Sequence, residues 1–343
     1  EGAGCYHERN HGDRSLRHAR RRSGDDGGSQ PSHLRPPGAK RGGGIRVILE
    51  HLNATPAAPS RVVILGAGGF VGGQAAARLE ADGISVLCLT RAEVDLLAQG
   101  AAEKLAGLLE PEDCLVMVSA MAPCKNAAML ADNIAMMSVV CSALEQSPVF
   151  HVVYISSDAV YSDSDGPLRE DSVTAPDNLH GIMHVARELM VESVMGETPL
   201  AILRPSLLYG LDDPHNGYGP NSFRRRATKG EDITLFGEGE ERRDHVLIDD
   251  VAEIIRLVVL HRSKGVLTVA TGEVVSFKEL AEMVVAQFDE AVAIKGSPRK
   301  GSVPHEGYRP FDASACREAF PEFRYTPPAE GIARVHAEMM KTG

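Results

Sequence analysis

The sequence predicts an α/β fold in which helices cover both faces of a parallel sheet, and two observations support this. Short apolar runs rich in β-branched residues lie at residues 61–65, 85–90, 114–120, 149–156 and 200–206. Segments of helical character lie between them, over roughly 70–83, 93–109, 126–146 and 178–195. Strands that alternate with helices of this length form βαβ units, whose sheets are buried on both faces.

Composition limits the class of protein. A chain of 343 residues with 43% apolar residues has ample core for one large domain or two in close contact. No apolar run approaches the roughly 20 residues of a membrane span, so no membrane is expected as a partner. The net charge of −11 argues against nonspecific binding to nucleic acid. The six cysteines form no CxxC pair, which favours reduced, mostly buried thiols in a cytoplasmic protein.

The N-terminal segment differs from the rest of the chain. Residues 1–45 hold nine Lys or Arg against five Asp or Glu, with many glycines and few aliphatic residues. Such a segment buries too little apolar surface to offset the entropy lost on ordering. We therefore predict that residues 1–58 form a disordered or artefactual extension, and the fold begins near residue 59.

The first strand runs into a glycine-rich turn that opens a helix. The glycines Gly66, Gly69 and Gly72 are spaced GxxGxxG within GAGGFVG. The first allows a tight turn, the second lets the backbone approach a pyrophosphate, and the third lets the helix pack close to the strand. A tight βα turn without a ligand is the alternative. The strand–turn–helix context predicts a dinucleotide site in a Rossmann-type doubly wound sheet.

The end of the second strand bears on the choice of cofactor. NAD-preferring folds commonly place an acid there to bind the adenosine ribose. Here Thr90 and Arg91 occupy that position, and Arg91 could pair with a 2′-phosphate. This gives a slight preference for NADP over NAD, although Arg91 could instead be a solvated surface residue. Asp95 and Leu96 follow and could lie against the adenine.

Beyond residue 206 the strand–helix alternation loosens. Residues 214–223 are rich in turn formers, and residues 233–246 are predicted to form a strand, a loop and a strand. A helix follows with Asp249 or Asp250 near its N-terminus, and a later helix opens with the capping box of Ser276 and Glu279. This half of the chain supplies a smaller, mixed C-terminal lobe.

Several motifs, in order along residues 61–340, resemble one family. They are GAGGFVG, Asn133 in LADNIAMMSVVCSAL, VYISSDAVYSDSDGPLRED, LRPSLLYG, GPNSF, LFGEGEERRDHVLIDDVA and YRPFD. Together they resemble the extended short-chain dehydrogenase/reductases of the NAD-dependent epimerase/dehydratase type. The resemblance implies an NAD(P)-binding Rossmann domain over residues 59–210. It also implies a substrate-binding lobe over 211–343, with some segments returning to the Rossmann domain.

The resemblance also implies site residues and a substrate class, a nucleoside-diphosphate sugar. Ser157 matches the residue that hydrogen-bonds the reacting sugar hydroxyl, and Asn221 and Arg243 match residues that bind the phosphates. Phe236 matches a residue near the base, and Arg309 is a further candidate phosphate contact. Guanidinium forks and amide donors suit a diphosphate, although each of these residues could instead be an ordinary loop residue. Further implied cofactor contacts are Phe70, Val71, Ser119, Ala120, Asn133, His184 and Pro205.

One family motif is incomplete beside Ser157. Asp158 matches the first member of the acid pair that drives water loss in the family's dehydratases. The second position holds Ala159 instead of glutamate. A 4,6-dehydratase is therefore not expected, although Asp158 could share in proton transfer.

The family's catalytic YxxxK pair is replaced by His180 and His184, at the same spacing on one helix face. In one interpretation His180 exchanges the proton, since imidazole titrates near neutral pH, while His184 bonds the ribose and Arg187 supplies a cation. In a second, the chain binds dinucleotide and ligand without the family's chemistry. A zinc pair is a third, but two ligands are too few, and no metal is expected. The histidines could also be simple surface residues.

The sequence as a whole predicts an NAD(P)-dependent epimerase or reductase acting on a nucleoside-diphosphate sugar by hydride transfer at a sugar carbon. Ser157 and His180 would handle the hydroxyl proton, with Asp158 and His184 as the other candidate catalytic residues. The alternative is a catalytically silent NAD(P)-binding protein of the same fold that acts as a sensor or partner. The resemblance further implies a homodimer formed through a bundle of the helices at 126–146 and 178–195.

Overall fold

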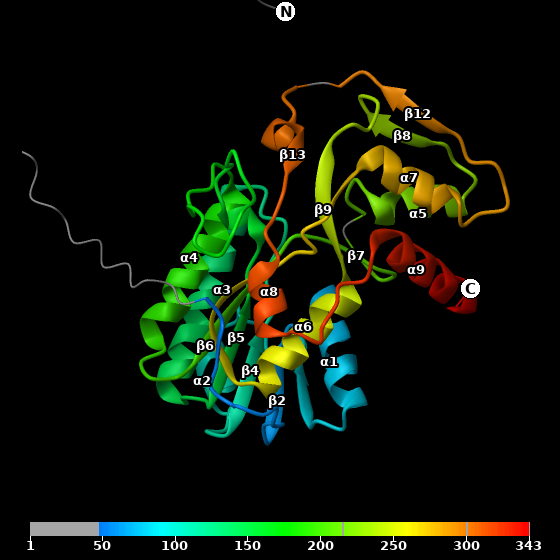
Figure 1. Cartoon of the computed structure of the whole chain (residues 1–343). Helices are drawn as coiled ribbons and strands as arrows, with labels where there is room; N and C mark the ends of the chain where they lie inside the picture. Colours follow the sequence, from blue (N-terminus) through cyan, green and yellow to red (C-terminus); the bar gives the residue numbers. More distant parts are fainter. Residues whose placement is uncertain (1–47, 215, 300, 343) are drawn as a thin grey trace, which may run out of the picture. The chain divides into compact units, whose positions relative to one another are not determined.

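The computed structural model describes residues 48–214, 216–299 and 301–342, and a seven-stranded sheet forms its centre (Figure 1). The strand order is β1-β10-β6-β5-β4-β2-β3, and every pair is parallel except β1 with β10. The bounds are β1 (Glu50–His51), β2 (Arg61–Leu65), β3 (Val86–Leu89), β4 (Asp113–Met117), β5 (His151–Ile155), β6 (Leu200–Pro205) and β10 (Ser263–Val269). This is the doubly wound parallel sheet that the sequence predicts.

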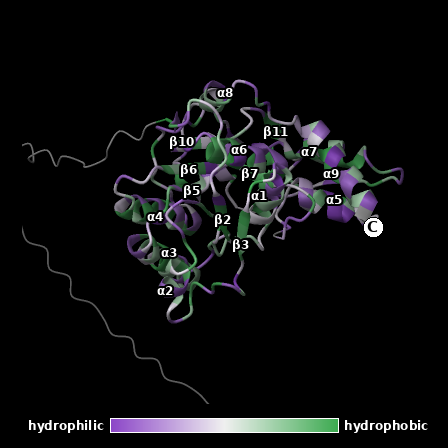
Figure 2. Cartoon of the chain, turned by 90° about the horizontal axis from the view of Figure 1, so that it is seen from below, coloured by the Kyte–Doolittle hydropathy of each residue, from purple (hydrophilic) through white to green (hydrophobic). Residues whose placement is uncertain are grey.

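Helices cover both faces of this sheet because its strands are apolar on both sides. In β2, Val62 and Ile64 join the core beneath α1 (Phe70–Ala81) and α6 (Ile248–Leu260). Val63 and Leu65 join the core beneath α2 (Ala101–Ala106), α3 (Ala127–Gln146) and α4 (Leu179–Val194). Figure 2 shows hydrophobic residues of the sheet lying between these two helical layers. Alternate residues of one strand therefore supply two separate cores.

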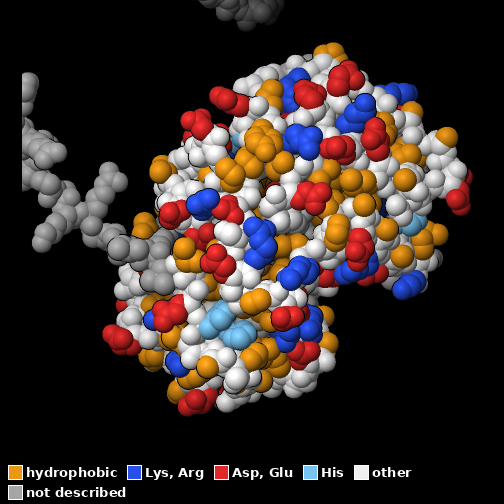
Figure 3. Space-filling view, in the orientation of Figure 1, with side chains coloured by type: hydrophobic (Ala, Val, Ile, Leu, Met, Phe, Trp, Pro, Cys, Tyr) orange, Lys and Arg blue, Asp and Glu red, His pale blue; other side chains and the backbone are white. Residues whose placement is uncertain are grey.

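A smaller lobe follows β6, and parts of the chain return from it to the main sheet. Its strands are β7 (Leu207–Tyr209), β8 (Ile233–Phe236), β9 (Arg242–Leu247), β11 (Val274–Ser276), β12 (Ile294–Ser297) and β13 (Tyr308–Arg309). Its helices are α5 (Pro220–Thr228), α7 (Phe277–Val285) and α9 (Pro328–Thr342), and α8 (Ser314–Ala319) contacts β10. The predicted capping box of Ser276 and Glu279 opens α7. Figure 3 shows acidic and basic side chains interspersed over one face of the molecule.

Three sequence predictions need correction. The extension predicted to reach residue 58 overlaps an ordered strand, because β1 pairs with β10 and His51 bonds Ser263 and the Ala319 carbonyl. These contacts join residues that are far apart in the sequence, so local sequence patterns do not predict them. Residues 1–47 of the predicted extension lie outside the described residues. The helix predicted over 93–109 is confined to α2, since Gly100 takes a left-handed φ of 76° just before it. The turn-rich run over 214–223 is partly helical, because Pro220 starts α5.

Helix α3 and the cysteines also refine the composition argument. In the part of the chain that the structure describes, α3 is the one helix long and apolar enough to cross a membrane by length and composition alone. Its buried residues include Asn133, Met137 and Val140, and it packs between α2 and α4. Among the five described cysteines, all free, only Cys88 is exposed, because β3 is an edge strand.

Candidate active site

The glycine turn lies between β2 and α1 and is packed too tightly for side chains. A Cβ on Gly72 would lie 2.2 Å from the Gly66 carbonyl oxygen, and one on Gly66 would lie 2.8 Å from the Ser119 backbone nitrogen. Gly69 is the N-cap of α1, and no described side chain caps it. The first turn of α1 therefore keeps backbone N–H groups for an anion, which is the cradle that a dinucleotide pyrophosphate needs.

One basic and one acidic residue, Arg91 and Asp95, follow β3 on the side of the glycine turn where the sequence predicts the adenosine. The Arg91 guanidinium donates to the Asp95 carboxylate at 3.2 Å and is 81% exposed. Asp95 also accepts from the Leu97 backbone N–H at 3.1 Å, which lowers the pKa of its carboxyl. Arg91 suits a 2′-phosphate and Asp95 suits ribose hydroxyls, so this pair is compatible with NADP and with NAD.

Asn133 supports the loop after β4 rather than forming part of the cleft wall. It is fully buried, accepts from the Met121 backbone N–H at 2.9 Å, and donates to the Met121 and Met129 carbonyls. Arg187 joins it, donating to the Ser119 carbonyl at 2.6 Å and to Asn133 Oδ1 at 3.3 Å. Arg187 is 1% exposed and is not among the cleft-lining residues, so it supplies no cation there directly.

Ser157 and Asp158 follow β5 and line the cleft. The Ser157 hydroxyl accepts from the Ala159 backbone N–H at 3.1 Å, which caps the short helix η1 (Asp158–Val160), and donates to Asp158 at 3.3 Å. Asp158 in turn accepts from Arg309 Nε at 3.3 Å. The hydroxyl is thus held in one position by the backbone that follows it.

The two histidines lie at the start of α4 and both line the cleft. Asn178 caps this helix by accepting from the Gly181 backbone N–H at 2.9 Å. The rings of His180 and His184 lie 4.8 Å apart at 79°, and His180 Nδ1 accepts a long hydrogen bond of 3.4 Å from the Cys124 backbone N–H. Among the described residues, no group of three or more potential ligands could hold a metal ion.

A tyrosine that the sequence reasoning missed sets the tautomer of His184. Tyr154 Oη lies 3.0 Å from His184 Nδ1, and both residues are buried. Burial raises the pKa of Tyr154 to about 12 and, with nearby His180 and Arg187, lowers the pKa of His184 well below its ordinary value. The tyrosine hydroxyl bonds no other described group, so we assign its proton to a bond with Nδ1. The neutral His184 ring then carries its own proton on Nε2.

Beneath Ser157 lies a buried ion pair between α4 and β6. Arg204 donates to both carboxylate oxygens of Glu188, at 2.9 and 2.7 Å, and both side chains are fully buried. Ser156 donates to the same carboxylate at 2.6 Å, and Arg204 reaches the Tyr161 hydroxyl at 3.1 Å. This network ties the strand that precedes Ser157 to the helix that carries the histidines.

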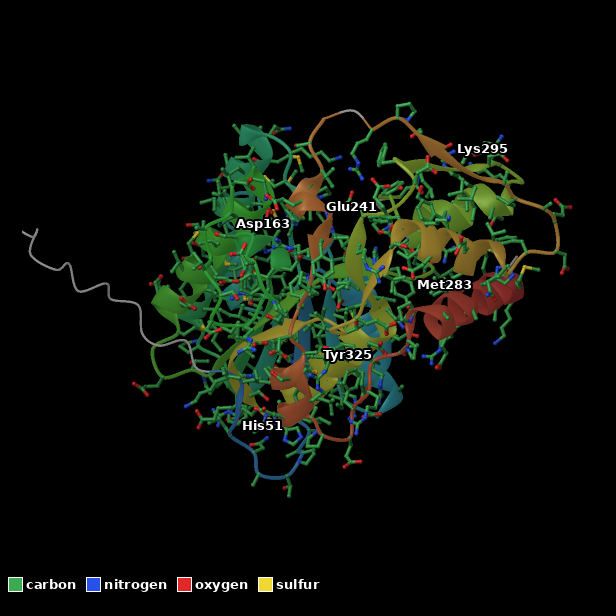
Figure 4. All side chains as sticks on the ribbon, turned by 45° about the horizontal axis from the view of Figure 1, so that its top comes forward. His51, Asp163, Glu241, Met283, Lys295 and Tyr325 are labelled. Carbon is green, nitrogen blue, oxygen red and sulfur yellow. The ribbon has the colours of Figure 1, made fainter. Side chains whose placement is uncertain are left out.

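The predicted phosphate and base residues of the smaller lobe are partly engaged with the protein itself. Arg243 pairs with Glu241 at 2.5 Å and donates to the Pro304 carbonyl at 2.6 Å. Arg309 lines the cleft but is 4% exposed and donates to Asp158 and Asp163, so these two carboxylates would compete with a phosphate for its guanidinium. Asp163 follows η1 on the side of the main sheet, whereas Glu241 belongs to the smaller lobe (Figure 4).

One cleft of about 1420 Å³ unites most of the predicted site. The predicted residues that line it are Gly66, Gly69, Phe70, Val71, Arg91, Asp95, Leu96, Ser119, Ala120, Ser157, Asp158, His180, His184, Pro205, Asn221 and Arg309. Four predicted residues lie outside the lining: Gly72, Asn133, Phe236 and Arg243. Gly72 is behind the turn, and Phe236 is 49% exposed against Tyr218.

Sequence reasoning missed other lining residues, notably Asp163, Tyr218, His245 and His305. Two of them lie within motifs that the resemblance quotes without assigning them a role: Asp163 in VYISSDAVYSDSDGPLRED and His245 in LFGEGEERRDHVLIDDVA. The order of these motifs was therefore the available signal. Asp163 and His245 reach the same cleft because β9 pairs with β13, whose Arg309 bonds Asp163 in the loop after β5.

The sequence model of the NAD dependent epimerase/dehydratase family matches residues 62–270, more than half of the chain. A dTDP-L-rhamnose 4-epimerase of Burkholderia thailandensis is 31% identical over 150 residues. That match covers 40% of this chain and 41% of the relative, so the chain spans less than half the length of this relative.

Solved structures show the same fold at low identity. The UDP-N-acetylglucosamine 4-epimerase from Bacillus cereus superimposes with a TM-score of 0.71 at 21% identity, covering 82% of this chain and 96% of that one. A GDP-L-fucose synthetase from Naegleria fowleri, bound to NADP, gives 0.74 at 15% identity, covering 84% and 98%. Identities this low establish the fold alone.

Proposed function

The chain belongs to the NAD-dependent epimerase/dehydratase family, and we propose that it is an NAD(P)-dependent epimerase or reductase of a nucleoside-diphosphate sugar. The observation that carries this proposal is the single cleft, about 1420 Å³, lined by both the glycine turn and the Ser157–His180 pair. A dinucleotide and a sugar could therefore meet in one space. A bound NAD(P) would supply hydride transfer at a sugar carbon.

The residues of this chain would divide the remaining work. The backbone of Gly66–Gly69 and the start of α1 would bind the pyrophosphate. Ser157 would hydrogen-bond the reacting hydroxyl, and His180 would exchange its proton, with Asp158 beside them. His184, through Nε2–H, would donate to a cofactor ribose hydroxyl.

Substrate binding would involve the smaller lobe. Asn221 lines the cleft, and Arg243 would have to exchange Glu241 for a substrate phosphate, since both oxyanions compete for one guanidinium. Phe236, exposed beside Tyr218, would hold the base.

Among related folds, one synthetase has NADP bound and another protein, MoeE5, has UDP-glucose and NAD. We propose NAD or NADP here, with Arg91 giving a slight preference for NADP, and cytoplasmic action consistent with free thiols.

A second candidate is a catalytically silent NAD(P)-binding protein, and one observation favours it. Cys124 N–H points at His180 Nδ1, so the neutral ring carries its proton on Nε2. In that tautomer Nε2 has no lone pair to accept a proton from a sugar hydroxyl. Catalysis by His180 therefore requires release of this 3.4 Å bond, whereas binding alone does not.

Turnover of a panel of UDP-, GDP- and dTDP-sugars with both cofactors separates these candidates. We expect the wild type to convert at least one sugar, and His180→Ala to lower kcat by about 10²–10⁴-fold. Products are read by chromatography and mass spectrometry, and dinucleotide binding by calorimetry. If only the double variant His180→Tyr, His184→Lys turns over a sugar, the wild type works by binding. If the wild type bound neither NAD nor NADP, both candidates would be contradicted.

We also propose a homodimer through the outer faces of α3 and α4. Ile182 and Leu189 of α4 are 42% and 57% exposed although both are large and apolar. We expect the wild type to have twice the 36.7 kDa chain mass by light scattering, and Ile182→Asp with Leu189→Asp to be monomeric. Met340→Asp, at an exposed position of α9, is the matched control and should remain dimeric. A monomeric wild type would contradict the proposal.

A further inference from the structure

His245 stands on β9 at the wall of the cleft, in the half formed by the smaller lobe. Its backbone partner across the β7–β9 pair is Leu207, which also lines the cleft. The ring meets Phe277 edge-on at 5.6 Å. Gly219 lies beside both rings, since an added Cβ there would be 3.6 Å from His245 Nε2 and 3.4 Å from Phe277.

The ring is buried but not hydrogen-bonded. His245 is 2% exposed, and neither ring nitrogen has a hydrogen-bond partner among the described residues. His151, also buried at 1%, shows the ordinary arrangement: its nitrogens meet Cys114 Sγ at 3.3 Å and the Ser263 carbonyl at 2.7 Å. An unpaired buried polar atom destabilises a fold, so packing alone would favour phenylalanine at position 245.

The chemistry of this ring limits what it could bind. Burial lowers the pKa of His245 to about 4, and a contact with the Arg243 backbone, which falls short of a well-formed hydrogen bond, offsets this only in part, so the ring is neutral at pH 7. A neutral imidazole has one N–H donor and one lone-pair acceptor. A sugar hydroxyl can both accept and donate, whereas a phosphate oxygen only accepts. Neither nitrogen has a well-formed hydrogen bond to give up when a ligand in the cleft offers one.

We infer that His245 is a specificity-determining residue that hydrogen-bonds a hydroxyl of the sugar when substrate occupies the cleft. The inference rests on the proposed function, since it needs a nucleotide sugar in this half of the cleft. It adds a contact on the sugar, apart from those proposed for the diphosphate and the base. The unpaired nitrogens are then satisfied only in the complex. They lower the stability of the free protein, and in exchange they favour a ligand that carries a hydroxyl at this position over one that lacks it.

Two matched comparisons test it. The variants are His245→Phe, His245→Gln and the control His151→Phe, and the probes are each nucleotide sugar of the panel and its nucleoside diphosphate alone. We expect His245→Phe to weaken the sugar nucleotide at least tenfold by calorimetry while leaving the diphosphate within twofold. His245→Gln should recover part of the loss. Without ligand, His245→Phe should melt higher than the wild type and His151→Phe lower.

The outcomes separate this inference from the proposed function. If the wild type binds a sugar nucleotide and His245→Phe binds it equally well, the inference fails and the proposed function stands. Equal weakening of the sugar nucleotide and the diphosphate would also overturn it, because the contact would not be on the sugar. A lower melting temperature of ligand-free His245→Phe would show that the nitrogens are satisfied within the fold. If the wild type binds no sugar nucleotide, the proposed function and the inference fall together.

Discussion

Replacing Glu188 by alanine is expected to lower the free energy of unfolding by about 3–5 kcal/mol, because it leaves a buried guanidinium without its counter-ion. Arg204 is 0% exposed and donates to both oxygens of the Glu188 carboxylate. The substitution also removes the acceptor of Ser156, which precedes the catalytic candidate Ser157. The measurement is urea unfolding followed by circular dichroism at pH 7.

A double variant separates the lost pair from the stranded charge. Glu188→Met with Arg204→Met removes both charges, and it should be clearly more stable than Glu188→Ala, since an apolar pair can replace a buried ion pair at little cost. Glu330→Ala is the surface control. It removes an exposed partner of Arg334 at 2.9 Å, and such pairs contribute about 0.2–1 kcal/mol or less. A loss below about 1 kcal/mol for Glu188→Ala would contradict the assigned role of the pair.

Gly181→Ala is expected to disrupt the site directly, because no room exists for a methyl group between α4 and η1. The added Cβ would lie 2.1 Å from the Ala159 carbonyl oxygen and 2.4 Å from Pro176 Cβ. Overpacking of this kind costs about 1–3 kcal/mol of stability. The helix must also move away from the backbone that orients Ser157, and a shift of about 1 Å can lower the rate about 10²-fold. Unfolding by urea and kcat on the sugar found in the panel are the two measurements.

The control for this substitution is Gly166→Ala, whose Cβ would meet nothing within 4 Å. It should leave both the unfolding free energy and kcat near the wild-type values. If Gly181→Ala were as stable and as active as Gly166→Ala, the close packing of α4 against η1 would not hold the histidines near Ser157. Where the wild type has no turnover, dinucleotide affinity replaces kcat as the functional readout.

The sequence by itself determined the parallel sheet, most of its helices and the glycine turn, because these depend on local patterns. Apolar runs of strand length, the glycine spacing before α1 and the Ser276–Glu279 box are all read within a few residues. Motif order also brought Ser157, His180 and His184 to one site, and all three line the cleft. The sequence failed where local pattern was weak, at β1 and before α2.

Only the tertiary structure decided which polar groups neutralise one another. Arg309 bonds Asp158 across 151 residues of sequence, and Tyr154 meets His184 across 30. The sequence suggested that Arg187 supplies a cation beside His180 and His184. Its guanidinium instead donates to the Ser119 carbonyl, outside the cleft lining. Side-chain charge and tautomer depend on burial and on partners brought together by folding, and neither is encoded in the spacing of residues along the chain.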